Sequence, residues 1–118
     1  MNIRIEEQKI RFKISEEELK ELMEGHIINS HIDFMANSMT VLINPNALGD
    51  NMEVKHVFDD DMSYITLLVP SHILSDLNDM GKNRDGVSAK QGEVSLSLQV
   101  DVRKDTRARD KGAVREKA

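Results

Sequence analysis

The segment EVSLSLQVDV, residues 93–102, is the strongest indication of secondary structure in the chain. Apolar and polar residues alternate along it without a break, and the apolar ones are Val94, Leu96, Leu98, Val100 and Val102. A period of two is that of a β-strand, whose successive side chains point to opposite faces of a sheet. The segment therefore predicts a strand with one buried face and one face in water.

The same period of two occurs at the start of the chain. Ile3 and Ile5 alternate with polar residues, and so do Ile10, Phe12 and Ile14. Weaker strand patterns cover residues 26–34, 38–43, 52–58 and 62–69. Together these segments predict about seven strands.

Two short helices are predicted between the strands. Ser15 followed by Glu18 is a capping-box pair, and Gly25 is a natural residue just beyond a helix C-terminus. A second helix is predicted to begin at Pro70 and to end before Gly81, because proline is well tolerated at the start of a helix. An acidic hairpin turn, 59–61, is predicted between two of the strands.

These elements predict a single α+β domain. We expect a mostly antiparallel curved sheet, or a small open barrel, of about seven strands with two short helices. At 118 residues one domain is the default, and Leu, Ile, Val and Phe supply 32 residues for its core. The predicted domain covers residues 1–104, and residues 105–118 are expected to be a basic tail, either mobile or a marginal helix.

Two strand-to-helix units match at a constant offset of 55 residues. The matched pairs are Ile10 with Ile65, Phe12 with Leu67, Ile14 with Val69, Ser15 with Pro70, Leu19 with Leu74 and Leu22 with Leu77. One hypothesis is a pseudo-twofold duplication of a strand-strand-helix-strand unit. The alternative is chance, because six matches among common apolar residues make a short alignment.

Charge is segregated along the chain. The formal net charge is −5. It sums to +2 over residues 1–14, to −4 over 15–25, to −7 over 26–80 and to +4 over 81–118. An acidic middle between basic ends indicates either a partner surface or a sheet and tail that neutralise each other.

Several kinds of chemistry are excluded or unsupported. The absence of cysteine excludes disulfides, thiolate zinc sites and cysteine nucleophiles. The histidines His26, His31, His56 and His72 match no metal-ligand spacing, and no nucleotide-binding or hydrolase motif is present. No catalytic, cofactor-binding or metal-binding residue is therefore predicted, and we lean against an enzyme.

A basic stripe is the one candidate binding face. Arg4, Lys9, Arg11 and Lys13 lie on the polar side of the first two predicted strands, and Arg103 and Lys104 follow the last strand. Such a face could hold an anion or a partner. Nucleic acid is disfavoured, because the chain has only three Phe and one Tyr and a negative net charge. A plain solvated sheet face is the competing interpretation.

The opening of the chain resembles a family of small uncharacterised bacterial proteins. The residues that carry the resemblance are Asn2-Ile3-Arg4-Ile5, Ile10-Arg11-Phe12-Lys13-Ile14-Ser15 and Glu18-Leu19. The resemblance implies two strands and a Ser- or Thr-capped helix within about residues 1–105. It implies no activity, cofactor or functional residue.

We therefore predict a non-enzymatic binding or protein-interaction module in the bacterial cytoplasm. A homodimer through a sheet edge is a further hypothesis, with the long strand at 93–103 as the candidate edge. One alternative is a small hydrolase or isomerase with a motif-free His/Asp site. A second is phosphate or nucleic-acid binding through the basic stripe. No apolar run is long enough to span a membrane.

Overall fold

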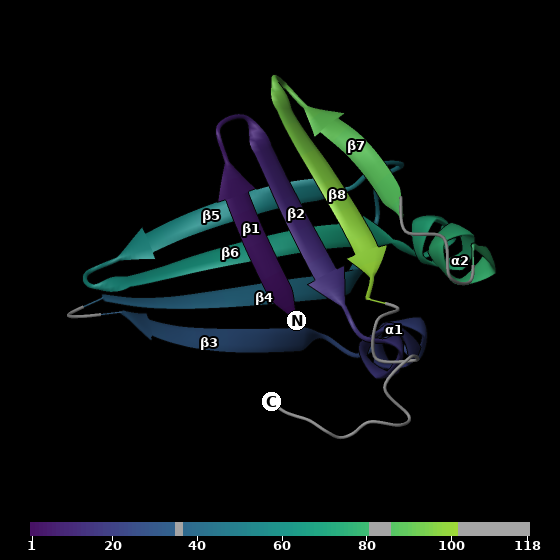
Figure 1. Cartoon of the computed structure of the whole chain (residues 1–118), viewed down its shortest axis with the longest axis horizontal. Coiled ribbons are helices and arrows are strands. Elements are labelled where there is room, and N and C mark those ends of the chain that lie inside the picture. Colours follow the sequence, from purple (N-terminus) through teal and green to yellow (C-terminus); the bar gives the residue numbers. More distant parts are fainter. Residues whose placement is uncertain (35–36, 81–85, 102–118) are drawn as a thin grey trace, which may run out of the picture.

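Two four-stranded β-sheets and two short helices make up the computed structural model, which describes residues 1–34, 37–80 and 86–101 (Figure 1). The elements in chain order are β1 (Asn2–Glu6), β2 (Lys9–Ile14), α1 (Glu16–Met23), β3 (Ile28–Phe34), β4 (Asn37–Ala47), β5 (Glu53–Asp59), β6 (Met62–Pro70), α2 (Ser71–Asp79), β7 (Val87–Gln91) and β8 (Val94–Val100). Both helices lie at the same end of the molecule and contact each other.

Each sheet has a parallel pair of strands at its centre and antiparallel pairs outside it. Sheet A has the order β1-β2-β8-β7, and sheet B has the order β3-β4-β6-β5. The central pairs β2–β8 and β4–β6 are parallel, and the four outer pairs are antiparallel. The strands of sheet A run obliquely across those of sheet B (Figure 1).

The predicted α+β class is confirmed, and most strand pairs are antiparallel as expected. The strands form two separate sheets, however, and the described strands close no barrel. The described residues form eight strands where the sequence predicts about seven, because β7 was not predicted. Its sequence VSAKQ has only Val87 and Ala89 as apolar residues, which is too short an alternation to recognise.

The capping box predicted at the start of α1 is confirmed. Ser15 Oγ accepts a hydrogen bond from the Glu18 N–H at 3.1 Å, and Glu18 Oε1 accepts one from the Ser15 N–H at 2.9 Å. The N-terminal ammonium of Met1 donates to Glu18 Oε2 at 3.1 Å. This carboxylate therefore joins the start of β1 to the start of α1. Gly25 follows the helix with a φ of +90°, a left-handed conformation that favours glycine.

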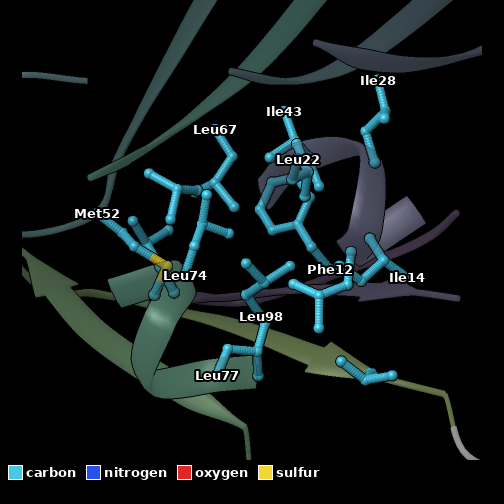
Figure 2. Packing of buried hydrophobic residues seen from close by; sticks show 14 of the residues in the cluster. Phe12, Ile14, Leu22, Ile28, Ile43, Met52, Leu67, Leu74, Leu77 and Leu98 are labelled. Carbon is cyan, nitrogen blue, oxygen red and sulfur yellow. The ribbon is translucent and has the colours of Figure 1, made fainter. Parts of the chain in front are cut away.

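The core lies where the inner faces of both sheets meet the helices (Figure 2). Its buried residues are Phe12, Ile14, Leu96, Leu98 and Val100 from sheet A, Ile28, Val41, Ile43, Ile65, Leu67 and Val69 from sheet B, Leu19, Leu22, Leu74 and Leu77 from the helices, and Met52. These are the alternate apolar positions of the strands and the Leu-x-x-Leu stripes of the helices. The period-two pattern therefore assigned the inner faces correctly at β2, β6 and β8.

The elements follow the same order in both halves of the chain. Each half consists of a hairpin, a helix and a second hairpin. The observed unit therefore has two strands after its helix, where the predicted strand-strand-helix-strand unit has one. If each strand of sheet A is replaced by its counterpart in the other half, the order β1-β2-β8-β7 becomes β5-β6-β4-β3. This is the order of sheet B, read from its other edge. Phe12 of β2 and Leu67 of β6, which match at the 55-residue offset, are both fully buried. Duplication of one ancestral unit stays a prediction.

The long strand β8 is not at an edge. It lies between β2 and β7, and both neighbours occupy its backbone hydrogen-bonding groups. β8 therefore cannot pair with a second copy of the chain. The edge strands of the described sheets are β1, β7, β3 and β5. The predicted tail, 105–118, lies outside the described residues. Among the described residues no helix is long and apolar enough to cross a membrane.

Candidate functional site: an apolar cleft between the sheets

A cleft of about 710 Å³ opens between the inner faces of the two sheets. It lies at the ends of β2, β4 and β6 that are remote from the helices. Its apolar lining consists of Ile5 and Ile10 from sheet A and Ile32, Met39, Val54, Phe58 and Ile65 from sheet B. The cleft is therefore lined by the same inner sheet faces as the core, at the end of the sheets that α1 and α2 do not cover.

Strand alternation explains which side chains reach the cleft. In β5, Val54, His56 and Phe58 face inward, where their register partners on β6 are Leu67, Ile65 and Ser63. The residues between them face the outside of sheet B. Ile5 of β1 lies opposite Ile10 of β2 in the same way and supplies the other wall.

Three apolar side chains at the cleft remain open to solvent. The exposed fractions are 53% for Ile5, 43% for Ile32 and 71% for Phe58. Further along the same inner faces Phe12 and Leu67 are fully buried. The difference arises because the helices cover one end of the inner faces only. Clustered exposed apolar surface of this kind marks a binding site more often than a solvated surface.

A few polar groups converge on one side of the cleft. His56 Nε2 lies 3.3 Å from Ser63 Oγ, and Asp61 completes this side. The His56 ring also packs edge-on against Phe58, with 5.4 Å between the ring centroids. An apolar wall with a small number of polar groups is the usual composition of a small-molecule site, where the polar groups set the orientation of the ligand.

The predicted basic stripe lies on the opposite, outer face of sheet A. Arg4, Arg11 and Lys13 line a second hollow there, of about 380 Å³, together with Asn2, Ile3 and Gln99. Lys9 is on the same face but one row further along, opposite Glu6. The structure thus brings three of the six predicted residues together. Arg103 and Lys104 lie outside the described residues.

The four histidines are on different parts of the molecule. His56 is in the cleft, His31 is on the outer face of sheet B, His26 follows α1 and His72 is exposed in the first turn of α2. Within the described ranges no three His, Asp or Glu side chains are grouped so that they could hold a metal ion. The four histidines therefore do not gather in one place, as the hydrolase alternative requires. His56 shares the lining of the cleft with Asp61.

His31 belongs to a hydrogen-bonded chain that the sequence analysis missed. Its Nε2 lies 3.0 Å from Asp33 Oδ1 and its Nδ1 lies 3.0 Å from Thr40 Oγ1. Ser38 Oγ donates to Asp33 Oδ1 at 2.7 Å. The Ser38 hydrogen bond, followed by the hydrogen bond and charge of His31, lowers the pKa of Asp33 below its usual value. These hydrogen-bonded side chains are exposed on an open sheet face. They therefore lack the enclosure from water that catalysis by such groups needs.

Sequence reasoning also missed the cleft itself. Alternation identified Ile5 and Phe58 as positions on an apolar face, but it carried no information about which part of that face stays uncovered. The sequence does contain one indication of exposed apolar surface, which is that Val57 and Phe58 are adjacent. Adjacent residues of a strand point to opposite faces of the sheet, so only one of these two large apolar side chains can face the core.

Comparisons with known proteins identify a family but no function. The model of a family described as "Family of unknown function (DUF7009)" matches residues 1–114. No curated protein and no solved structure matches the chain.

Proposed function

We propose that this chain, which belongs to the family of unknown function DUF7009, is a non-enzymatic binding module that takes a small apolar ligand between its two sheets. The observation that carries the proposal is the apolar cleft with Ile5, Ile32 and Phe58 exposed at its surface. A bacterial origin and a cytoplasmic location remain predictions from the sequence.

The size and lining of the cleft support a small molecule. Its volume of about 710 Å³ is within the roughly 300–1,000 Å³ range that is common for ligand sites. Six of the lining residues are aliphatic or methionine, and one is aromatic. Covering the exposed parts of these side chains with an apolar ligand removes them from water, which is the main source of favourable free energy in such binding.

The polar side of the cleft restricts the ligand further. His56 and Ser63 offer a hydrogen-bonding pair, and Asp61 of the acidic turn adds a carboxylate. A hydroxyl or amino group can bond to these side chains, whereas a carboxylate on the ligand would be repelled by Asp61. We therefore expect a neutral or cationic amphiphile and not a fatty acid.

The shape of the site argues against a second copy of the chain as the occupant. In a twofold dimer the same surface of both copies meets, and here that surface is concave. One cleft cannot fill another, so the walls around Ile10, Met39 and Ile65 would stay without a partner. A ligand that enters the cleft covers them directly.

Fluorescence titration with N-phenyl-1-naphthylamine, a neutral apolar probe with one N–H, tests the proposal. Phe58→Ser should weaken binding about tenfold, the loss expected when about half of an aromatic contact is removed. Val57→Ser is the control, because Val57 is also exposed but faces the outside of sheet B. 1-Decanol and decylamine should displace the probe more strongly than decanoate does.

The outcomes separate the alternatives. Absence of saturable binding, or an equal loss in the Val57→Ser and Phe58→Ser variants, would contradict the proposal. Light scattering on the same samples identifies a second copy as the occupant if the wild-type chain is a dimer and Phe58→Ser is a monomer. Preference for decanoate would overturn the assignment of Asp61 to the polar end.

A further inference from the structure

The hollow on the outer face of sheet A collects positive charge from two adjacent strands. Arg4 on β1 lies directly opposite Arg11 on β2, and in the next row Asn2 lies opposite Lys13. On the other side of β2, Gln99 of β8 is the register partner of Lys13. Three cations and two amides therefore line one hollow of about 380 Å³.

This charge is not neutralised by the part of the chain that the structure describes. The three ion pairs among the described residues involve Met1, His26 and His31, and none of them involves the arginines or the lysine of the hollow. The acids of this face lie in other rows: Glu6 is opposite Lys9, and Asp101 follows the end of β8. Like charges directly opposite each other on an antiparallel pair are destabilising. A bound anion would relieve that repulsion.

The strand next to Arg11 carries a further unpaired group. Ser97 on β8 is the register partner of Arg11. Its hydroxyl is buried and has no hydrogen-bond partner among the described residues. A buried hydroxyl without a partner is unfavourable, and most native hydroxyls find one. The row of Arg4, Arg11 and Ser97 thus has several potential donors and no carboxylate acceptor.

We propose that this hollow binds the phosphoryl group of a small phosphorylated molecule. Guanidinium groups present paired N–H donors that match phosphate oxygens, and a lysine adds a point charge beside them. The amides of Asn2 and Gln99 supply further donors for the remaining oxygens. A phosphate dianion or pyrophosphate therefore matches both the charge and the donor geometry.

Nucleic acid fits this face less well. Single strands bind sheet faces through bases stacked on aromatic side chains. The outward residues of sheet A are Asn2, Arg4, Glu6, Lys9, Arg11, Lys13, Ser88, Lys90, Ser95, Ser97 and Gln99, and none is aromatic. The net charge of −5 further opposes a long polyanion. The hollow has room for one compact anionic group.

The phosphoryl site is independent of the cleft between the sheets. The two sites use opposite faces of β1 and β2, with Arg4 and Arg11 outward and Ile5 and Ile10 inward. Failure of apolar binding at the cleft would therefore leave this proposal untouched.

Calorimetric titration of the full chain with inorganic pyrophosphate at low salt tests the proposal. Saturable binding is expected, with affinity reduced about tenfold in Arg11→Gln, because a charge-assisted hydrogen-bonded pair is removed. Lys55→Gln is the matched control, since Lys55 is an exposed cation on the outer face of sheet B. Pyrophosphate should also raise the melting temperature of the wild-type chain and of Lys55→Gln, and raise that of Arg11→Gln by less at the same concentration.

Two results would overturn the proposal. One is the absence of pyrophosphate binding, or equal binding by the wild-type chain and Arg11→Gln. The other is binding of a single-stranded oligonucleotide, lost in Arg11→Gln, under conditions where pyrophosphate does not bind; this result would assign the hollow to nucleic acid. Arg4→Glu provides a second variant: it should abolish pyrophosphate binding while the chain stays folded.

Discussion

Arg4 and Arg11 are register partners on the antiparallel strands β1 and β2, so two arginines occupy directly opposed positions on the outer face of sheet A. Sequence alternation alone placed both residues on one face. Their direct opposition, and the absence of a paired carboxylate among the described residues, are properties of the strand register. This arrangement has a consequence for stability as well as for binding.

Arg4→Glu should stabilise the chain in the absence of ligand. The substitution replaces a repulsive cross-strand pair by an attractive one, and such pairs contribute roughly 0.2–1 kcal/mol. Urea unfolding at low salt measures the gain, which should shrink in 1 M NaCl because the pair is exposed and salt screens it. Arg4→Gln should give a smaller gain. Destabilisation by both variants would show that the two arginines do not repel each other in solution.

Gly86→Ala should destabilise the chain strongly, whereas Gly92→Ala should cost much less. Both glycines have positive φ, at +66° and +64°, so alanine is strained at either position. A Cβ at Gly86 would in addition clash with the backbone oxygen of Leu98, while nothing lies near a Cβ at Gly92. We expect a loss above about 3 kcal/mol at Gly86 and about 1 kcal/mol at Gly92. Equal losses in urea unfolding would contradict the clash.

Leu67→Ala should cost about 2–5 kcal/mol of unfolding free energy. Leu67 is fully buried at the centre of sheet B, and its truncation leaves a cavity beside α2 and Met52 (Figure 2). Leu48→Ala is the control, because Leu48 is completely exposed and its truncation should change stability by less than about 0.5 kcal/mol. A loss at Leu67 as small as that at Leu48 would be incompatible with the described core.

Ser38→Ala should raise the pKa of Asp33 toward its ordinary value without reaching it. The Ser38 hydroxyl is the largest cause of the lowered pKa, and the contribution of His31 remains in the variant. The ¹³C shift of the Asp33 carboxyl, followed against pH, measures the change. Thr40→Ala is the control, because Thr40 bonds to His31 and not to Asp33. An unchanged pKa in Ser38→Ala would exclude the hydrogen bond in solution.

The same pKa shift sets the direction of a pH effect on folding. Asp33 has a lower pKa in the folded chain than in the unfolded chain, so the unfolded chain binds the proton more tightly. Its contribution to stability is therefore present above the ordinary carboxyl pKa and is lost as the pH falls through the lowered value. The group is exposed, so the size of the effect is small.

Local structure was predictable where neighbouring residues cause it. The capping box at Ser15 and Glu18 and the acidic turn after β5 depend on residues within a few positions of each other. The inward positions of β2 and β8 follow from alternation. β7 escaped prediction because its apolar residues, Val87 and Ala89, are few and small, and its pairing with β8 gives it a strand conformation that its own sequence only weakly favours.

The amino-acid sequence by itself determined the α+β class, the faces of the principal strands, the start of α1 and the basic character of the outer face around Arg11. The tertiary structure alone decided that the strands divide into two sheets, that β8 is central, and that Phe58 lies at an open cleft while Leu67 is sealed in the core. The physical reason is that side-chain alternation is a local property of one strand. Which strands become neighbours, and which part of an inner face the helices cover, depend on contacts between residues far apart in the chain.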